Sequence, residues 1–276
     1  MKNTKKLWSN SIFAIVVIAL VGFAALSCGN GDCTTHTWGS WSITTPATCT
    51  STGTGTRTCT SCDATDSNTT IPALGHDINN WTANPGYKSC NNTGCSERTV
   101  VNLGDTGPGG GIIFYITPTG FTFFQTAADT TGVTRHYLEA APANISVGNW
   151  ASRIGDLIPG LSENATDETD WVIGRGMRNT EIIIAHGSAN GYTTRAATEA
   201  RNTTSGTLTD WFLPSRNELA ELYKIAGQHG IPNTGRLWSS SQSSNNSPWH
   251  LDLSNGSFSN GSNKSVNWGA RAVRAF

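Results

Sequence analysis

The residues of this chain best suited to chemistry are its cysteines, all of which lie before residue 100. Apart from Cys28, they are Cys33, Cys49, Cys59, Cys62, Cys90 and Cys95. Thiols at this density either cross-link a small domain as disulfides or, together with histidine, hold zinc. A zinc site would draw on Cys59-x2-Cys62 and Cys90-x4-Cys95, with His36 or His76. The redox compartment of the protein therefore decides between the two chemistries.

The first 27 residues have the pattern of an export signal. Lysines at positions 2, 5 and 6 precede an apolar run over residues 12–26, which is too short to span a membrane comfortably. The following Ala25-Leu26-Ser27-Cys28 resembles a lipobox, in which the cysteine is acylated and becomes the mature N-terminus. Residues 1–27 are therefore predicted to be a lipoprotein signal peptide. The alternative is an ordinary signal peptide that is cleaved nearby.

Lipidation of Cys28 would anchor the protein to a membrane of the cell envelope. Acyl chains contribute about 0.8 kcal/mol per buried methylene, so two or three of them hold a protein stably. Gly29 is not an inner-membrane retention signal, and we expect the outer membrane or the cell surface. Export favours disulfides over zinc at the other six cysteines, with Cys90–Cys95 the favoured pair among several possible connectivities.

The cysteine-bearing segment, residues 28–103, contains a degraded repeat. His36 precedes Trp41 by five residues, and His76 precedes Trp81 by the same spacing. The two units lie near residues 36–75 and 76–103. Because units of this size bury little apolar surface, cross-links are expected to replace a core. The first unit is similar to bacterial cell-surface repeats and, more distantly, to thrombospondin type 1 modules, in which tryptophans stack on arginines; here Arg57 is the available arginine.

Charge is scarce in this chain, with 13% Asp, Glu, Lys and Arg and a net charge of -1. Average soluble domains carry about 25% charged residues. A nearly neutral chain has no long-range field to attract nucleic acid, which is excluded as a partner.

A helix with marked ends is predicted within Asp210–Gly227. Ser215 lies at the N-cap position, and Glu218 follows three residues later, which is the pattern of a capping box. Gly227 is placed to end the helix in a left-handed conformation. One apolar stripe is formed by Leu219, Leu222, Tyr223 and Ala226.

The sequence DWFLPSRNEL at residues 210–219 resembles a family of bacterial surface domains. The resemblance extends to LWSS at 237–240, WHLDLSNGSFS at 249–259 and the terminal VRAF. The first half of the same domain is represented by GDTGPGGGIIFY at 104–115 and YLEAAP at 137–142. The family is typified by the C-terminal domain of collagen-like adhesins and has a C-type-lectin-like fold. The resemblance covers residues 104–276 and implies binding, as in adhesion and recognition of sulfated polysaccharide, rather than catalysis.

The remainder of residues 104–276 is expected to be mainly antiparallel strands. Gly107–Gly111 leads into a β-branched and aromatic run, so it predicts a turn before a strand and not a phosphate-binding loop. We expect strands near 112–116, 121–125, 136–140, 249–253, 257–259 and 270–276, and short helices over 181–186 and 194–201. Asn255-Gly256 predicts a type I′ hairpin turn. The lectin-like resemblance implies that Ile112–Tyr115 pairs with the segment around Ala272–Ala275.

Two polar segments hold the candidate ligand-binding residues. An acidic loop offers calcium ligands at Glu163, Asp167 and Asp170, although such loops are often only solvated. The Ser/Asn-rich segment 239–249 is too polar for a core yet is bounded by tryptophans, which stack on sugars. The candidate ligand contacts are Asn246, Trp249, Asp252, Asn267 and Trp268. Arg271 and Arg274 are instead expected to pair with Glu218 or Asp210.

No catalytic motif stands out, since no cysteine follows Cys95 and neither a G-x-S-x-G nor an H-E-x-x-H pattern occurs. We therefore expect a non-enzymatic α+β protein with a C-type-lectin-like domain, antiparallel with about three short helices, behind a disulfide-stapled β or irregular repeat segment. It would bind an extracellular glycan or a host or envelope protein, with no cofactor unless calcium binds. The alternative is a structural or assembly module of the envelope without a soluble ligand.

Overall fold

The structure is a computed structural model that describes residues 35–276 apart from residues 63, 85 and 165. The predicted signal peptide, Cys28 and Cys33 lie outside the described residues. Internal contacts divide the chain into two compact units, Met1–Gly75 and His76–Phe276. Among the described residues, no helix is both long and apolar enough to cross a membrane.

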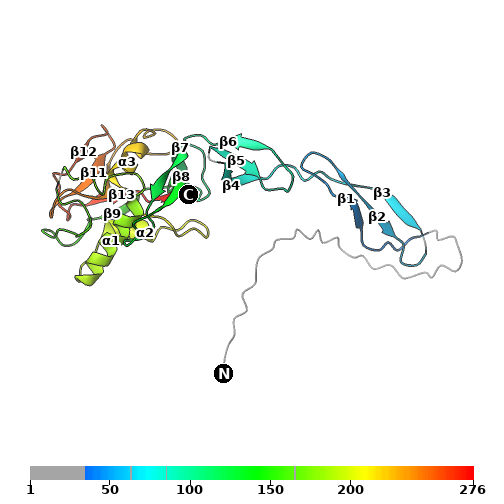
Figure 1. Cartoon of the computed structure of the whole chain (residues 1–276), viewed down its shortest axis with the longest axis horizontal. Coiled ribbons are helices and arrows are strands. Elements are labelled where there is room, and N and C mark those ends of the chain that lie inside the picture. The colour runs from blue at the N-terminus through cyan, green and yellow to red at the C-terminus, as the bar shows by residue number, and fades with distance from the viewer. Residues whose placement is uncertain (1–34, 63, 85, 165) are drawn as a thin grey trace, which may run out of the picture. The chain divides into compact units, whose positions relative to one another are not determined.

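The first unit is a small antiparallel sheet in the order β1-β2-β3, formed by Ser42–Thr45, Gly53–Thr58 and Thr65–Ile71 (Figure 1). Arg57 on β2 lies over the rings of Trp38 and Trp41, at 5.0 and 4.3 Å from their centroids. Its guanidinium also pairs with Asp66, at 3.0 Å. Arg57 therefore joins Trp38, Trp41 and Asp66 in a sheet that is too small to bury a large hydrophobic core.

The second unit begins with a sheet of the same order, β4-β5-β6, formed by Ile78–Asn84, Tyr87–Cys90 and Arg98–Val100. Lys88 lies 5.0 Å from the ring centroid of Trp81, and it precedes Cys90 by two residues, as Arg57 precedes Cys59. The edge of Trp81 also packs against Tyr137 and Phe276, with centroid distances of 5.9 and 5.4 Å. These contacts attach the β4-β5-β6 sheet to the C-terminal body.

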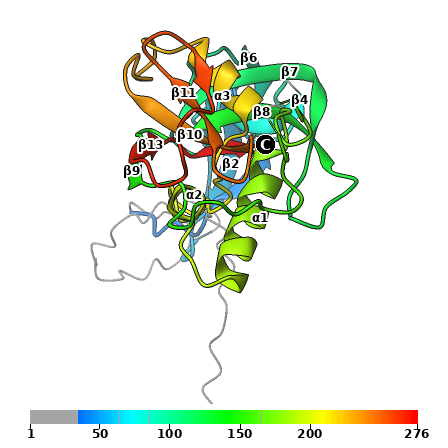
Figure 2. The same cartoon turned by 90° about the vertical axis from the view of Figure 1, so that its left-hand side faces the viewer.

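The C-terminal body combines two further sheets with three helices (Figures 1 and 2). One sheet has the order β14-β8-β7, with β7 at Ile112–Phe123, β8 at Val133–Ala140 and β14 at Val273–Ala275. The other has the order β12-β11-β10-β13-β9, with β9 at Ile145–Gly148, β10 at Arg236–Gln242, β11 at Pro248–Asp252, β12 at Phe258–Ser259 and β13 at Trp268–Ala270. The helices are α1 at Gly176–Ala189, α2 at Arg195–Arg201 and α3 at Arg216–Tyr223. The fold class is α+β, with mostly antiparallel strands.

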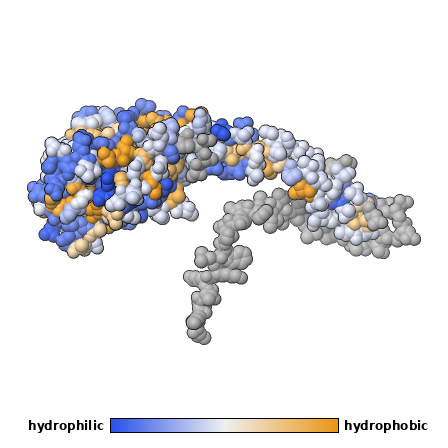
Figure 3. All heavy atoms as spheres, viewed as in Figure 1, coloured by the Kyte–Doolittle hydropathy of each residue, from blue (hydrophilic) through white to orange (hydrophobic). Residues whose placement is uncertain are grey.

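Helices cover both faces of the five-stranded sheet (Figure 2). Leu237 on β10 packs in one core cluster with Leu219 and Leu222 of α3, while its neighbour Trp238 packs in a second cluster with Ile183 of α1. Alternation along a strand sends successive side chains to opposite faces, which is why adjacent residues belong to different clusters. On the face drawn in Figure 3, hydrophobic residues appear among hydrophilic ones over this body.

The predicted pairing of Ile112–Tyr115 with Ala272–Ala275 is wrong, because β8 lies between them. Ala140 on β8 pairs with Ile112 on one side and with Val273 on the other. The opening and closing strands thus share a sheet as second neighbours. The predicted single strand 270–276 is also divided, since the chain leaves the five-stranded sheet after Ala270 and enters the three-stranded one at Val273.

The capping box of α3 is confirmed. Ser215 Oγ accepts from the N–H of Glu218 at 3.3 Å, and the Glu218 carboxylate accepts from the N–H of Ser215 at 2.8 Å. The same carboxylate also accepts from the N–H groups of Gly174 and Gly176, at 2.8 and 3.4 Å. Burial raises the pKa of Glu218 to about 7, although these donors oppose the rise. The helix ends at Tyr223, before Gly227, whose φ is +78°.

One predicted turn is wrong, and one predicted helix has other bounds. The type I′ turn requires positive φ at both central residues, but Asn255 does not have it and instead accepts the N–H of Ser257 on its side chain, at 2.9 Å. The helix predicted over 181–186 is present but longer, Gly176–Ala189, so Asn179 and Thr180 are buried inside it. The helix predicted over 194–201 is confirmed as α2, with Thr194 at its N-cap.

Glu139 and Arg274 form the buried ion pair at the centre of the three-stranded sheet. Arg274 Nη1 lies 3.1 Å from Glu139 Oε2, and the side chains are 6% and 0% exposed. Glu139 also accepts from the N–H groups of Gly109 and Gly111, at 3.0 and 2.7 Å. The predicted pairing of Arg274 with Asp210 is confirmed at 2.8 Å. The N–H groups of the Gly107–Gly111 turn thus bind the carboxylate of Glu139.

Breaking the buried pair should be costly. We expect Arg274→Met to lower the free energy of unfolding by about 3–5 kcal/mol, because it leaves the Glu139 carboxylate buried without its cation. The double variant Arg274→Met/Glu139→Gln should cost less than the sum of the single changes, as measured by urea unfolding. Lys224→Ala, which removes the exposed pair with Glu221, is the control and should cost less than about 1 kcal/mol. Equal costs for Arg274→Met and the control would contradict this assignment.

The buried Glu218 should make stability depend on pH. Its pKa rises from 4.5 to about 7 on folding, so between these values the folded state binds the proton more tightly than the unfolded state. This contribution is fully present below about pH 4.5 and is lost as the pH rises toward 7. It amounts to as much as about 3 kcal/mol. In Glu218→Gln this part of the pH dependence should disappear from unfolding curves measured over that range, and an unchanged slope would refute it.

Candidate ligand-binding site

A shallow hollow on the C-terminal body brings together two of the residues predicted to contact ligand. It has a volume of ≈ 380 Å³ and is lined by Gly235, Arg236, Asp252, Ser254 and Trp268. Asp252 and Trp268 come from the sequence prediction, and Arg236 was missed. The hollow therefore combines an indole ring, a guanidinium and a carboxylate, which are the groups that proteins use to stack on and hydrogen-bond to polar ligands.

The strand register positions these three side chains. Arg236 on β10 lies opposite Asp252 on β11, and their side chains form a salt bridge of 3.0 Å. On the other side of β10, the parallel pairing of Leu237 with Gly269 places Trp268 beside the same strand end. The guanidinium carbon of Arg236 lies 5.3 Å from the Trp268 ring centroid. Knowing how β10 pairs with β11 would have identified Arg236 as the partner of Asp252. The sequence alone does not fix the register of these two strands.

Buried rings support Trp268 from behind. Its ring centroid lies 3.9 Å from that of His250 and 4.6 Å from that of Trp238, which is fully buried. Burial lowers the pKa of His250 to about 4, with the charge of Arg236 contributing. The imidazole is therefore neutral at physiological pH, and Arg236 is the cation that a ligand would meet in the hollow.

A second hollow lies on the other side of Trp268. It has a volume of ≈ 390 Å³ and is lined by Ser146, Gly148, Asn267, Trp268 and Gly269. Asn267 is exposed, and its side chain lies close to Gly148, whose φ is +77°. Trp268 therefore separates two adjoining hollows, and an extended ligand could contact both of them.

The structure places the other two predicted contacts elsewhere. Trp249 precedes His250 on β11, so its side chain lies on the opposite face of the sheet. Its ring and that of Trp171 form a T-shaped pair with centroids 5.1 Å apart. Arg216 lies over both indoles, at 4.8 Å from Trp249 and 4.3 Å from Trp171. Asn246 is exposed in the loop before β11, where its carbonyl accepts from the N–H of Lys264 at 3.0 Å. Neither residue lines the two hollows beside Trp268.

The predicted calcium ligands have separate partners. The buried Asp170 carboxylate accepts from Ser162 Oγ at 2.5 Å and from the N–H of Gln242 at 2.9 Å, and burial raises its pKa to about 6. Asp167 accepts from the N–H groups of Thr169 and Glu163, and the Glu163 side chain is exposed. Calcium binding by Glu163, Asp167 and Asp170 stays a prediction. It would require Asp170 to exchange these partners for the ion.

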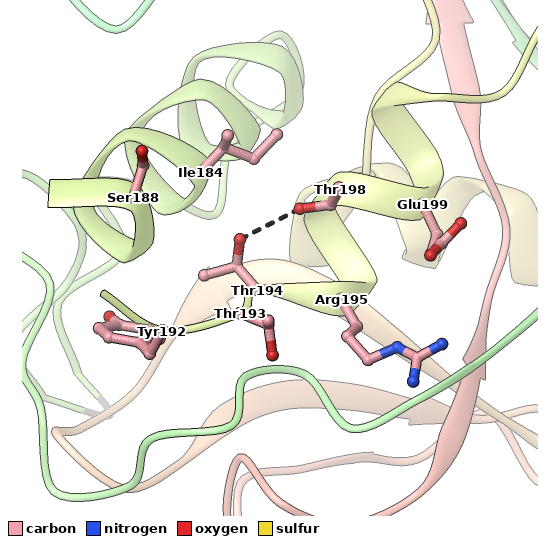
Figure 4. A pocket seen from close by; sticks show the side chains of 8 residues that line it. All are labelled: Ile184, Ser188, Tyr192, Thr193, Thr194, Arg195, Thr198 and Glu199. Carbon is pink, nitrogen blue, oxygen red and sulfur yellow. Dashed lines mark hydrogen bonds between the residues drawn. The ribbon is translucent and has the colours of Figure 1, made fainter. Parts of the chain in front are cut away.

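A further hollow lies between α1 and α2 (Figure 4). It has a volume of ≈ 460 Å³, and its lining includes Ile184 and Ser188 from α1, Arg195 and Glu199 from α2, and Tyr192 between the helices. Thr194 and Thr198 form a hydrogen bond of 3.3 Å beside it (Figure 4). No sequence pattern indicates this hollow, because its walls come from two helices whose packing is not set by local sequence.

The described cysteines gather with histidines at the ends of the two small sheets. Cys59 and Cys62 lie near His36 in the first unit, and Cys90 and Cys95 lie near His76 in the second. Cys49 precedes β2 in the first unit, and its carbonyl accepts from the N–H of Gly75 at 3.1 Å. The predicted disulfides at these positions and at Cys33 stay predictions.

Comparisons with known proteins give little guidance. No family model matches the chain, and no curated protein matches it. One similar solved structure is a fimbrial protein from Bacteroides ovatus, which is 12% identical with a TM-score of 0.37. The match covers 82% of this chain and 57% of that one, so the chain spans little more than half of the fimbrial protein's length. A TM-score this low is no evidence for a shared fold.

Loss of the Arg236 side chain should leave the fold intact. The arginine is 49% exposed, and exposed ion pairs contribute less than about 1 kcal/mol. Arg236→Gln should therefore change the free energy of unfolding by less than that amount in urea titrations. A much larger loss would show that the Arg236–Asp252 pair holds the β10-β11 hairpin together and is not available to a ligand.

Proposed function

We propose that this protein is a lipid-anchored component of a bacterial cell envelope whose C-terminal body binds extracellular polysaccharide beside Trp268. The anchor is proposed at Cys28 and rests on the lipobox-like sequence before it. The single observation that carries the binding proposal is the partly exposed Trp268 ring, held by buried rings between two hollows and flanked by Arg236 and Asp252. No catalytic role is proposed.

The body is proposed to be a divergent C-type-lectin-like domain. Three features support this relation. The sequence motifs of residues 104–276 resemble that family, the first and last strands lie in one sheet, and a capped helix packs beside the second sheet. The first and last strands, β7 and β14, are separated by β8, whereas the resemblance implied that they pair directly.

The chemistry of the site favours a sugar polymer over a compact metabolite. Both hollows are shallow and lie on either side of one indole, which suits an extended chain that stacks one ring on Trp268 and continues across it. Arg236 can donate to hydroxyl, carboxylate or sulfate groups, and Asp252 can accept from hydroxyls. Arg236 is the residue that would favour an acidic polysaccharide.

Polysaccharide binding should depend on Trp268 and Arg236. On an array of neutral and acidic glycans, the full chain should bind. Trp268→Ala should lose about fivefold to tenfold in affinity, because a stacked ring contributes about 1–1.5 kcal/mol. Arg236→Gln should selectively weaken binding to acidic glycans, with greater loss at low salt.

Trp249→Phe is the matched control, because Trp249 lies on another part of the body and should leave binding unchanged. Absence of binding by the folded wild-type chain to every glycan would contradict the proposal. It would favour the alternative of an envelope assembly module that binds other proteins.

A further inference from the structure

The first small sheet carries a compact group of soft metal ligands. His36 lies before β1, and Cys59 and Cys62 lie in the turn between β2 and β3. Their ligand atoms lie within 4.8 Å of one another, and His36 Nδ1 is 3.4 Å from Cys62 Sγ. Cys59 is buried while His36 is exposed, so one side of the group is open to solvent. An imidazole and two thiols at this separation can converge on one ion.

The β4-β5-β6 sheet carries a second group at the corresponding position. His76 lies before β4, Cys90 ends β5, and Cys95 lies in the turn before β6. These ligand atoms also lie within 4.8 Å of one another, and His76 Nδ1 is 3.2 Å from Cys95 Sγ. Again the histidine is exposed and the first cysteine is buried.

The backbone around the two groups follows the same hydrogen-bond scheme. In each sheet, the residue after the first cysteine donates its N–H to the carbonyl of the residue after the histidine: Thr60 to Thr37 at 2.7 Å, and Asn91 to Asp77 at 2.9 Å. The N–H of the first cysteine donates to the carbonyl two residues beyond the second cysteine, at 2.9 and 3.1 Å. The turns differ in length by two residues, yet both hold their cysteines near the histidine. The two groups therefore share the arrangement of their ligands, although the sequences between the two cysteines differ.

We propose that each of these two groups binds a zinc ion. Zinc takes thiolate sulfur at about 2.3 Å and imidazole nitrogen at about 2.0–2.1 Å in a tetrahedron, which places ligand atoms about 3.4–3.8 Å apart. The imidazole-to-sulfur distances of 3.4 and 3.2 Å lie at or near that range, and the other ligand atoms of each group lie within 4.8 Å of one another. In sheets with so little apolar burial, the bound ion would supply folding free energy that a core supplies elsewhere.

The hydroxyl of Ser61 lies 3.2 Å from the Cys59 sulfur. It could donate a hydrogen bond to that sulfur when the sulfur binds metal as a thiolate.

The presence of a histidine in both groups favours zinc binding over disulfide formation. A disulfide between two cysteines needs no histidine, whereas both sheets place an imidazole nitrogen beside a cysteine sulfur. The segment after Cys28 also holds six cysteines and two histidines, which is the number of donors that two four-coordinate ions require. The proposal assigns three ligands to each ion and is independent of glycan binding by the C-terminal body.

Metal analysis of the full chain tests this proposal. The chain is purified under argon without chelators, zinc is measured by mass spectrometry, and cobalt is added to a metal-depleted sample. We expect one equivalent of zinc for each group and, with cobalt, the near-ultraviolet absorption of sulfur-to-metal charge transfer. Cys62→Ser and Cys95→Ser should each lose about one equivalent, and the double variant should lose both.

The controls keep the ligands and change their neighbours. Ser61→Ala and Ser96→Ala should retain both equivalents. Because a ligand variant can also unfold its sheet, thiol alkylation of the denatured, unreduced wild-type chain gives a second measurement, and all of these cysteines should be alkylated after zinc removal. Disulfide-bonded Cys59, Cys62, Cys90 and Cys95 in chain taken from cells, or zinc retained by the double variant, would overturn the proposal.

Discussion

The ion pair between Glu139 and Arg274 is the interaction on which the C-terminal body depends. It joins the middle and last strands of one sheet, and it fixes the glycine-rich turn through two N–H donors to the same carboxylate. A side chain at Gly107 would meet that carboxylate carbon at 2.4 Å, so only glycine leaves room for it there. A buried carboxylate without these donors and this cation would be strongly unfavourable. The turn, both strands and the chain end are therefore coupled.

Arg274 of this pair lies only six residues after Trp268 of the candidate site. β14 belongs to the three-stranded sheet, and β13, just before it, belongs to the five-stranded sheet and carries Trp268. The two-residue crossing at Arg271-Ala272 is buried, and Arg271 donates to Asn144 at 3.1 Å. The position of Trp268 is thus set by the packing of both sheets, which gives a stacking platform a rigid support.

The two small sheets use a different principle of stability. Each places a cation over a tryptophan and gathers two cysteines near a histidine, and neither has the apolar content of the C-terminal body. Cross-linking by a bound ion or by disulfides suits such units, because it does not require a large core. The stability of each small sheet would then depend on metal or redox state, whereas the C-terminal body is stable through packing.

Local sequence patterns determined the features that rest on local interactions. The capping box of Ser215 and Glu218, the helix after Thr194, the strand after the glycine turn and the repeated histidine-to-tryptophan spacing all involve residues close in the chain. The pairing of Arg274 with Asp210 was expected from the sequence, whereas Arg271, for which the same partners were expected, donates to Asn144 instead.

Tertiary structure alone decided the features that join distant segments. The insertion of β8 between the first and last strands, the placement of Arg236 beside Trp268, and the separation of Trp249 from that site depend on strand register and sheet order. The physical reason is that a strand presents alternating faces, and the sequence does not say which neighbour will cover each face. The sequence determined which residues could bind a ligand, and the packing of the sheets decided which of them lie together.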